Sequence, residues 1–183
     1  MATKFEELNH EIIDFIEKQK IYFVATATEE SFINLSPKGM DSFKIIDNKR
    51  VVWINATGST NESSAHIQRN KRMTIMFCSF EKDPLIVKLI GNAKVIHKND
   101  KEWDELSNLL PNLSGCRQIF DVRLEMVLTV CGMAVPYFEY KGERNDLREW
   151  AINQGDEGLI DYWGKKNQVS LNGEATHILE KNT

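Results

Sequence analysis

Residues 50–78 read RVVWINATGSTNESSAHIQRNKRMTIMFC, and their pattern is the most informative in the sequence about the fold. It contains two runs rich in β-forming residues, Arg50–Asn55 and Arg72–Cys78. Between them lies a small and polar stretch, 56–64, which leads into a short helical segment that ends near Asn70. The pattern predicts a strand, a polar loop, a short helix and a second strand, in that order.

Further β-forming runs lie on both sides of this stretch. They predict strands at Ile21–Ala27, Ser31–Ser36, Ser42–Ile46, Leu85–Val95, with a bend at Gly91, and Arg117–Val130. Several of these strands are joined by turns that are too short for a crossover connection, which favours an antiparallel sheet. So many strands in one domain favour closure into a barrel. The predicted fold class is therefore mainly β with flanking helices.

Helical patterns occupy the two ends of the chain and one segment between strands. They predict helices from Thr3 to about Lys18, with Thr3 and Glu6 as a capping box, from Asp100 to about Leu110, from Asn145 to Gly155, and from Gly158 to about Lys166. The tail from Asn167 is polar, and we expect it to be loosely held. The whole chain, 1–183, is expected to form one domain, with a barrel core and N-terminal helix at 1–132 and a helical C-terminal extension at 133–183.

Composition excludes several classes of protein. With 42% hydrophobic and 27% charged residues the chain is expected to fold, and its net charge of −4 makes nucleic acid an unexpected partner. The longest stretch without a charged side chain, Met126–Phe138, is shorter than the roughly 20 residues that span a bilayer, so no membrane span is expected. The first residues lack a signal-peptide pattern and the three cysteines form no framework. We therefore expect a cytoplasmic protein.

Most catalytic and metal-binding motifs are absent from the sequence. The four histidines, His10, His66, His97 and His177, are scattered without metal-ligand spacing, and no GxSxG or Gly-rich nucleotide signature occurs. No metal site is therefore predicted, and no catalytic residue can be assigned.

Two features are suited to binding an anion. Lys38 lies at a strand end beside Gly39, where a sharp turn would let its ammonium meet a phosphate. Residues 57–61 directly precede the short helix, whose N-terminus offers free N–H groups and the positive end of the helix dipole. Each feature also has a simpler interpretation. Lys38 could be a solvated lysine in a turn, and Ser59 with Glu62 could cap the helix and do nothing else, while Glu62 would repel a nearby phosphate.

Taken together, the segments NLSPKGMDSF (34–43), residues 50–78 and PLIVKLIGNAKV (84–95) resemble the pyridoxamine 5′-phosphate oxidase-like family of FMN-binding split barrels. The resemblance implies a six-stranded antiparallel split β-barrel whose homodimer holds FMN at the subunit interface. It implies cofactor roles for Lys38 at the phosphate, for Ser36 at the isoalloxazine edge and for Ile54 and Asn55 beside the flavin. It places Ser59, Thr60 and Asn61 where enzymes of the family use Ser-Arg-Lys on the phosphate.

The sequence also departs from the family pattern. Two phosphate-binding cations are missing at Thr60 and Asn61, and residues 134–138 lack the arginine and histidine that hold the vitamin B6 substrate. Arg117 and Gln118 open the last strand and could reach the cofactor across an interface, although Arg117 could equally be an exposed strand end. Cys131 would lie near the flavin face, where a buried, inert cysteine is the simpler interpretation.

Two functional hypotheses follow from the resemblance. The first is an FMN-dependent oxidoreductase that acts on an unknown small molecule and is not a true pyridoxamine 5′-phosphate oxidase. The alternative is a non-catalytic protein that binds a flavin or a phosphate ligand, or a relative that binds a deazaflavin or haem. The lost cations favour the alternative, whereas the absence of an acid–base pair does not exclude catalysis, because the flavin carries the chemistry.

Overall fold

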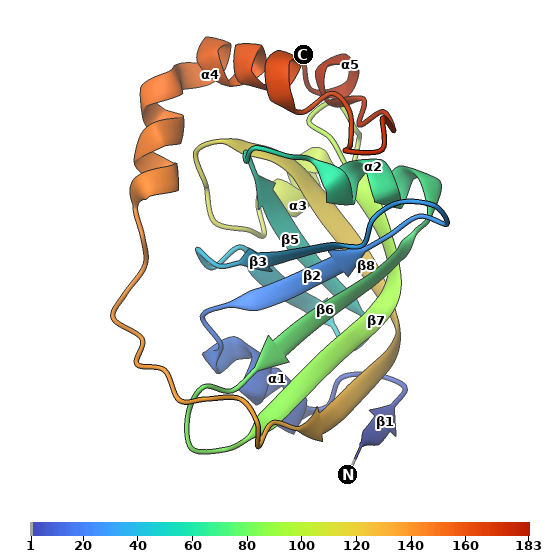
Figure 1. Cartoon of the computed structure of the whole chain (residues 1–183), viewed down its shortest axis with the longest axis vertical. Coiled ribbons are helices and arrows are strands. Elements are labelled where there is room, and N and C mark those ends of the chain that lie inside the picture. The colour runs from blue at the N-terminus through green and yellow to red at the C-terminus, as the bar shows by residue number, and fades with distance from the viewer. Residues whose placement is uncertain (1) are drawn as a thin grey trace.

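The computed structural model describes residues 2–183, which form one antiparallel sheet with helices at both of its ends (Figure 1). The strands of this part of the chain are β1 (Thr3–Phe5), β2 (Tyr22–Thr26), β3 (Asn34–Lys38), β4 (Phe43–Asp47), β5 (Arg50–Ala56), β6 (Arg72–Cys78), β7 (Leu85–Ile96) and β8 (Cys116–Cys131). The helices are α1 (His10–Lys18), α2 (Glu62–Arg69), α3 (Trp103–Ser107), α4 (Asp146–Lys166) and α5 (Ile178–Asn182).

The sheet is a barrel that does not close. Its strands follow the order β3-β2-β6-β7-β8-β5-β4, with β1 paired to β8, and the described residues form no ladder between β3 and β4. The split barrel predicted from the sequence is therefore confirmed. Eight strands take part, so the six-stranded core of the resemblance is extended in this chain.

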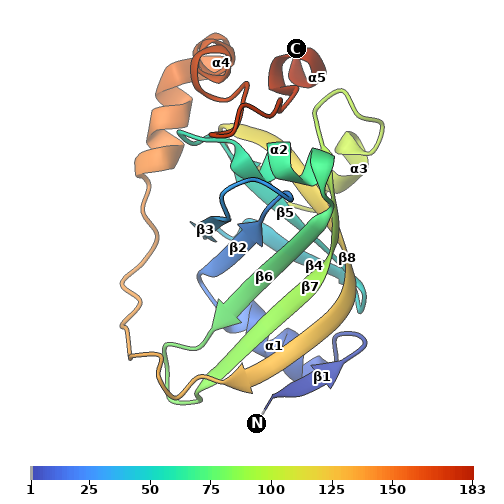
Figure 2. The same ribbon diagram turned by 45° about the vertical axis from the view of Figure 1, so that its right-hand side comes forward.

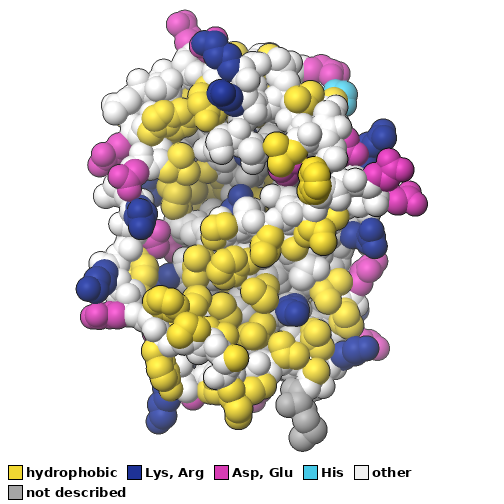
Figure 3. Space-filling view, viewed as in Figure 1, with side chains coloured by type: hydrophobic (Ala, Val, Ile, Leu, Met, Phe, Trp, Pro, Cys, Tyr) yellow, Lys and Arg dark blue, Asp and Glu magenta, His cyan; other side chains and the backbone are white. Residues whose placement is uncertain are grey.

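The alternation of side chains along the strands separates a buried inner face from an apolar outer face. On the inner face one row of cross-strand partners runs Val24, Ile75, Leu89 and Val127, and each of these side chains is fully buried. The adjacent row on the outer face runs Phe23, Met76, Lys88 and Leu128, and each is half-buried in the single chain. Figure 3 shows hydrophobic side chains gathered over this face, where β2, β6 and β7 lie in Figure 1.

Gly91 bends β7 as the sequence predicts. The register between β7 and β8 shifts between Ile90 and Gly91, and a Cβ atom at Gly91 would lie 2.1 Å from the carbonyl oxygen of Arg123. Because Cβ atoms do not approach a backbone that closely, only glycine lets the two strands come together at this bulge.

The predicted helix from Thr3 to Lys18 was wrong in its first half. Residues Thr3–Phe5 form β1 against Val127–Thr129 of β8, so the capping box at Thr3 does not form. The helix begins at His10, and Asn9 caps it by accepting a 2.9 Å hydrogen bond from the Ile12 amide. A free strand edge on β8 overrode the local helical pattern.

The C-terminal extension packs as a layer over one end of the barrel. Figures 1 and 2 show α4 and α5 beside α2, at the opposite end of the barrel from α1. The two predicted helices are the two halves of α4, which is interrupted at Gly155, where φ is 63°. The prediction that the tail from Asn167 is loosely held was wrong, because Asn167, Thr176 and Ile178 are all buried.

Candidate functional site

A polar loop, Thr57–Asn61, links β5 to α2 and is called here the anion loop. Its first residue is fixed twice to Gly115, since the Thr57 amide and hydroxyl both donate to that carbonyl, at 2.8 and 2.7 Å. The Thr57 hydroxyl also accepts a 2.9 Å hydrogen bond from the indole nitrogen of Trp163, on α4. The C-terminal extension therefore takes part in shaping the loop.

Arg117, at the start of β8, lies buried beneath the anion loop. Its guanidinium donates to the carbonyl oxygens of Thr60, at 2.7 Å, and Gly58, at 3.4 Å, and to Oδ1 of Asn167, at 2.6 Å. Its Nε has no hydrogen-bond partner, and no carboxylate of residues 2–183 forms an ion pair with it. Burial lowers the pKa of Arg117 to about 9. The site thus contains a buried positive charge that no neighbouring acid neutralises.

The N-terminus of α2 presents a row of free amides above this charge. Among the described residues, the backbone N–H groups from Ser59 to Ser64 have no protein acceptor, and the N-cap residue Asn61 makes no side-chain cap. The Asn61 side chain is buried and its Nδ2 has no partner. Free amides at the positive end of a helix dipole form a ready site for an anion.

Lys38 adds a second positive charge to the same region. It ends β3, and its ammonium lies 5.3 Å from the centre of the Trp53 ring. Burial, together with repulsion from Arg117, lowers the pKa of Lys38 to about 8. The turn that follows holds Met40 and Asp41 in the left-handed region, with φ of 63° and 52°, a strained arrangement of the kind that clusters at functional sites.

Lys38, Arg117 and residues 57–60 of the anion loop line one cavity of about 320 Å³. Its walls are Pro37, Lys38, Gly39, Met40, Ser42, Ile54, Ala56, Thr57, Gly58, Ser59, Thr60, Leu113, Arg117 and Leu147. The lining holds two cations and no carboxylate. Glu62, which the sequence suggested would repel a nearby phosphate, does not line the cavity, and its carboxylate accepts from the Leu171 amide, in the C-terminal tail, at 3.1 and 3.2 Å.

The structure brings together most of the residues that the sequence singled out. Lys38, Ile54, Ser59, Thr60 and Arg117 line the cavity. Ser36 shares the inner face of β3 with Lys38, and its buried hydroxyl has no partner. Behind the cavity, Asn55 donates to Asn61 at 3.3 Å and to Gln118 at 3.0 Å.

Three sequence expectations about this region were wrong. Arg117 is 3% exposed rather than a solvated strand end. Gln118, whose reach to the cofactor across an interface stays a prediction, is fully buried and hydrogen-bonds to Ser64 and His97 of its own chain. Ser59 does not form a capping box with Glu62, because no side chain caps α2. Cys131 is exposed and lies at the opposite end of the 16-residue strand β8 from Arg117.

Sequence reasoning missed the contributions of Trp163, Asn167, Leu113 and Leu147. Trp163 and Asn167 follow the anion loop by about a hundred residues and contact it only because the extension folds back over the barrel. No spacing or motif in the sequence signals these contacts.

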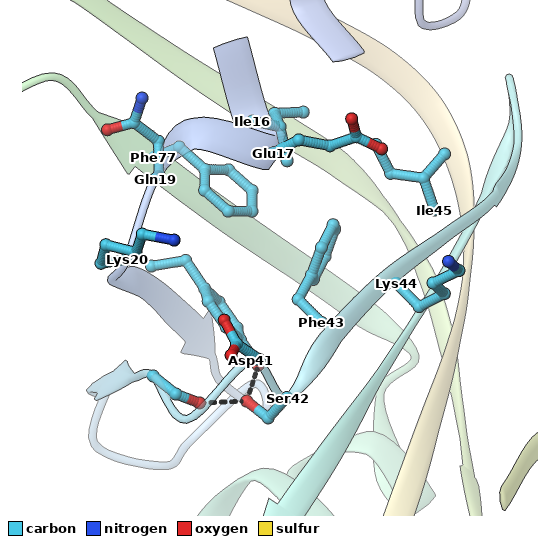
Figure 4. Close-up of a pocket in the computed structure, with 12 residues that line it drawn as sticks. Ile16, Glu17, Gln19, Lys20, Asp41, Ser42, Phe43, Lys44, Ile45 and Phe77 are labelled. Carbon is cyan, nitrogen blue, oxygen red and sulfur yellow. Dashed lines mark hydrogen bonds between the residues drawn. The ribbon is translucent and has the colours of Figure 1, made fainter. Parts of the chain in front are cut away.

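A second, smaller cavity of about 180 Å³ lies between α1 and β4 (Figure 4). Tyr22, Phe43 and Phe77 form its aromatic side, with ring centres 5.1 to 5.5 Å apart. Ser42 belongs to both cavities and fixes their shared wall by donating to the Gly39 carbonyl at 2.6 Å. The volume of this second cavity is below the roughly 300 Å³ typical of small-molecule sites. The cavity lined by Lys38, Arg117 and the anion loop, called here the anion cavity, is therefore the stronger candidate.

Neither a metal site nor a membrane span is found in residues 2–183. No three His, Cys, Asp or Glu side chains in this range are grouped so that they could hold a metal ion. None of the helices in the described part of the chain combines the length and the apolar character needed to cross a bilayer.

Comparison with known proteins finds a family model and a curated protein that are similar in sequence to this chain. The family model for pyridoxamine 5′-phosphate oxidase matches residues 8–131. The pyridoxamine 5′-phosphate oxidase family protein ustO of Aspergillus flavus is 29% identical over 193 aligned positions, which cover 94% of this chain and 77% of that protein.

Two solved structures are similar in fold. A protein of Lactobacillus delbrueckii named after pyridoxamine 5′-phosphate oxidase has a TM-score of 0.54 and 15% identity, over 67% of this chain and 94% of its own. HupZ from Group A Streptococcus has a TM-score of 0.51 and 19% identity, over 65% of this chain and 91% of its own.

Proposed function

Because the chain belongs to the pyridoxamine 5′-phosphate oxidase family, we propose that its anion cavity binds the phosphate of FMN and that the protein is a flavoprotein. The single observation that carries this proposal is the composition of the cavity. Lys38 and Arg117 line it together with residues 57–60 of the anion loop, and no carboxylate does. The amides of Ser59 and Thr60 have no protein acceptor among residues 2–183. A phosphate monoester would satisfy these groups, since it carries nearly two negative charges and several acceptor oxygens.

The residues present fit a phosphate despite the lost Ser-Arg-Lys pattern. Thr60 and Asn61 supply no cations, but Arg117 brings a positive charge to the loop from below. Asn61 Nδ2 and Ser36 Oγ are buried polar atoms without partners, and buried polar atoms of this kind usually have one. We propose that Lys38 and the loop amides hold the phosphate and that Ser36, Ile54 and Asn55 lie on the side of the ring system.

A bound flavin supplies hydride or electron transfer, which the side chains of this chain do not provide. The protein would then act as an oxidoreductase on a small molecule that the sequence does not identify. Ala134–Phe138 carry no arginine or histidine, so pyridoxamine 5′-phosphate is not the proposed substrate.

A second candidate is a flavin- or phosphate-binding protein without turnover. The observation that favours it is that no histidine, aspartate or glutamate lines the cavity, and that Lys38, the lining residue whose pKa is lowered to about 8, is assigned to the phosphate. The two candidates share the binding site and differ only in chemistry.

We also propose that the protein is a homodimer that pairs through the outer face of β2, β6 and β7. This face carries Phe23, Met76, Ile86 and Ile90, and Figure 3 shows hydrophobic side chains gathered over it. A large apolar patch on a folded chain is typical of a protein–protein interface. The exposed aromatics Tyr137 and Phe138, which precede α4, would add to the contact.

The test of the proposed function is the visible spectrum of the purified protein, followed by titration with FMN and with riboflavin. We expect flavin absorbance that is retained on gel filtration, or saturable quenching of FMN fluorescence by protein that is purified colourless. FMN should bind at least about tenfold more tightly than riboflavin, because a hydrogen bond to a charged group contributes roughly 1.5–3 kcal/mol. Equal affinity for the two flavins would rule out a phosphate site.

A further inference from the structure

Asn167, which follows α4, contacts the anion loop and Arg117 with the two polar atoms of its side-chain amide. Its Nδ2 donates to the Gly58 carbonyl at 2.9 Å, and its Oδ1 accepts from Arg117 at 2.6 Å. Arg117 in turn donates to the Thr60 carbonyl at 2.7 Å. The side chain of Asn167 is fully buried, so these bonds are shielded from water.

This arrangement determines which way the loop amides point. A trans peptide is planar, so the N–H of each residue points opposite to the carbonyl of the residue before it. Asn167 and Arg117 hold the carbonyls of Gly58 and Thr60 on the buried side. The amides of Ser59 and Asn61, which follow those carbonyls, are therefore turned away from Arg117, and neither has a protein acceptor among residues 2–183.

The chemical identity of residue 167 also determines the charge of the site. An aspartate would accept the same hydrogen bond from Arg117, but its negative charge would neutralise the guanidinium. The amide of Asn167 accepts that bond without adding charge. Arg117 therefore stays positive without an ion-pair partner among residues 2–183, next to a cavity that Lys38 also lines.

We propose that Asn167 is a positioning residue of the anion site, which orients the loop amides and leaves the charge of Arg117 available to a dianionic phosphate monoester. This inference rests on the proposed function, because it concerns the same cavity. It assigns a binding role to the C-terminal extension, which lies outside residues 8–131 of the family match. A bound phosphate and the docked extension then stabilise one another, because each favours the same arrangement of the loop.

The test compares four forms of the full-length protein: wild type, Asn167→Asp, Asn167→Ala and the control Asn153→Asp. The control places the same charge at an exposed position of α4. Affinities for FMN, riboflavin and inorganic phosphate are measured by calorimetry, and thermal unfolding is measured for each form. Amide hydrogen exchange in residues 57–64 is followed with and without phosphate.

We expect Asn167→Asp to lower the affinities for FMN and inorganic phosphate by about tenfold or more, the effect of losing a charged hydrogen-bond partner, and to change riboflavin affinity by less than about twofold. Asn153→Asp should match wild type. Asn167→Ala should speed exchange in the loop, because the Gly58 carbonyl and Arg117 both lose a partner. In wild type, phosphate should slow that exchange.

Three results would overturn the inference. The first is an Asn167→Asp protein that binds FMN and phosphate as wild type does. The second is a parallel loss of FMN and riboflavin affinity that follows the loss of thermal stability, which would indicate a merely structural role. The third is a wild-type protein that binds neither FMN nor phosphate. Wild-type protein that binds phosphate but not FMN would overturn the flavin proposal alone, and the Asn167 variants would then be compared with phosphate.

Discussion

Replacing Lys38 by methionine should strengthen the folded protein and weaken its hold on FMN. The charge of Lys38 is unfavourable in the fold, because burial and repulsion from Arg117 lower its pKa from 10.5 to about 8. Each pKa unit corresponds to about 1.4 kcal/mol. The partial exposure of Lys38 reduces the effect, so we expect methionine to raise the free energy of unfolding by roughly 1–3 kcal/mol at pH 7.

The pH dependence of this gain follows from the direction of the shift. Between pH 8 and 10.5 the unfolded chain holds the Lys38 proton while the folded chain has released it, so the stability of wild type rises with pH in this window. Below pH 8 the lysine is charged in both states and the penalty is complete. The stability difference between Lys38→Met and wild type should therefore be greatest at pH 7 and should shrink as the pH approaches 10.5.

The effect on ligand binding has the opposite sign. A hydrogen bond from the ammonium to a phosphate contributes roughly 1.5–3 kcal/mol, so FMN should bind about 10- to 100-fold more weakly to Lys38→Met. Riboflavin, which has no phosphate, should bind as it does to wild type. Methionine keeps most of the length of the side chain, so contacts with the Trp53 ring are largely retained.

The assay combines urea unfolding at pH 7 and pH 10 with fluorescence titration of both flavins. Lys44→Met, at an exposed position on β4, the next strand along the chain, is the matched control and should change neither property. The reasoning is refuted if Lys38→Met lowers stability at pH 7, or if it leaves the ratio of FMN to riboflavin affinity unchanged.

Three further predictions concern the fold, the assembly and the substrate. Gly91→Ala should lower the free energy of unfolding, measured by urea titration, by about 2–3 kcal/mol, because its Cβ would lie 2.1 Å from the Arg123 carbonyl oxygen. The control Gly164→Ala, whose Cβ would lie 3.6 Å from its nearest neighbour, should not destabilise the chain. Sedimentation at micromolar concentration should give a species of twice the 21.1 kDa chain mass, and Met76→Glu should convert it to monomer; wild type that sediments as a single chain would contradict this. Anaerobic mixing with pyridoxine 5′-phosphate should leave the bound flavin oxidised, because residues 134–138 offer no cation to the substrate phosphate, and bleaching of the flavin band within seconds would disprove this.

Local pattern in the sequence determined most of the barrel. Runs of β-forming residues with alternating apolar side chains, joined by short turns, predicted β2 to β8 to within a few residues. In a strand with one buried face, every second side chain points to the same face, so apolar residues recur every two positions. Lys38 and the stretch before α2 were also readable, since a lysine at a strand end and free amides at a helix start are local features. The bend at Gly91 was predicted because glycine inside a strand is itself a signal.

Only the tertiary structure determined which segments adopt a secondary structure other than the one their local pattern predicts, and which charged groups lie buried at the site. Thr3–Phe5 became a strand because the edge of β8 offered hydrogen-bond partners that a helix could not use. Arg117 became a buried cation, and Asn167 its partner, because the C-terminal extension folds over the end of the barrel and excludes water there. Such contacts join residues 50 to 110 positions apart, and no propensity or spacing encodes them, since they depend on which surfaces remain to be buried once the barrel has formed.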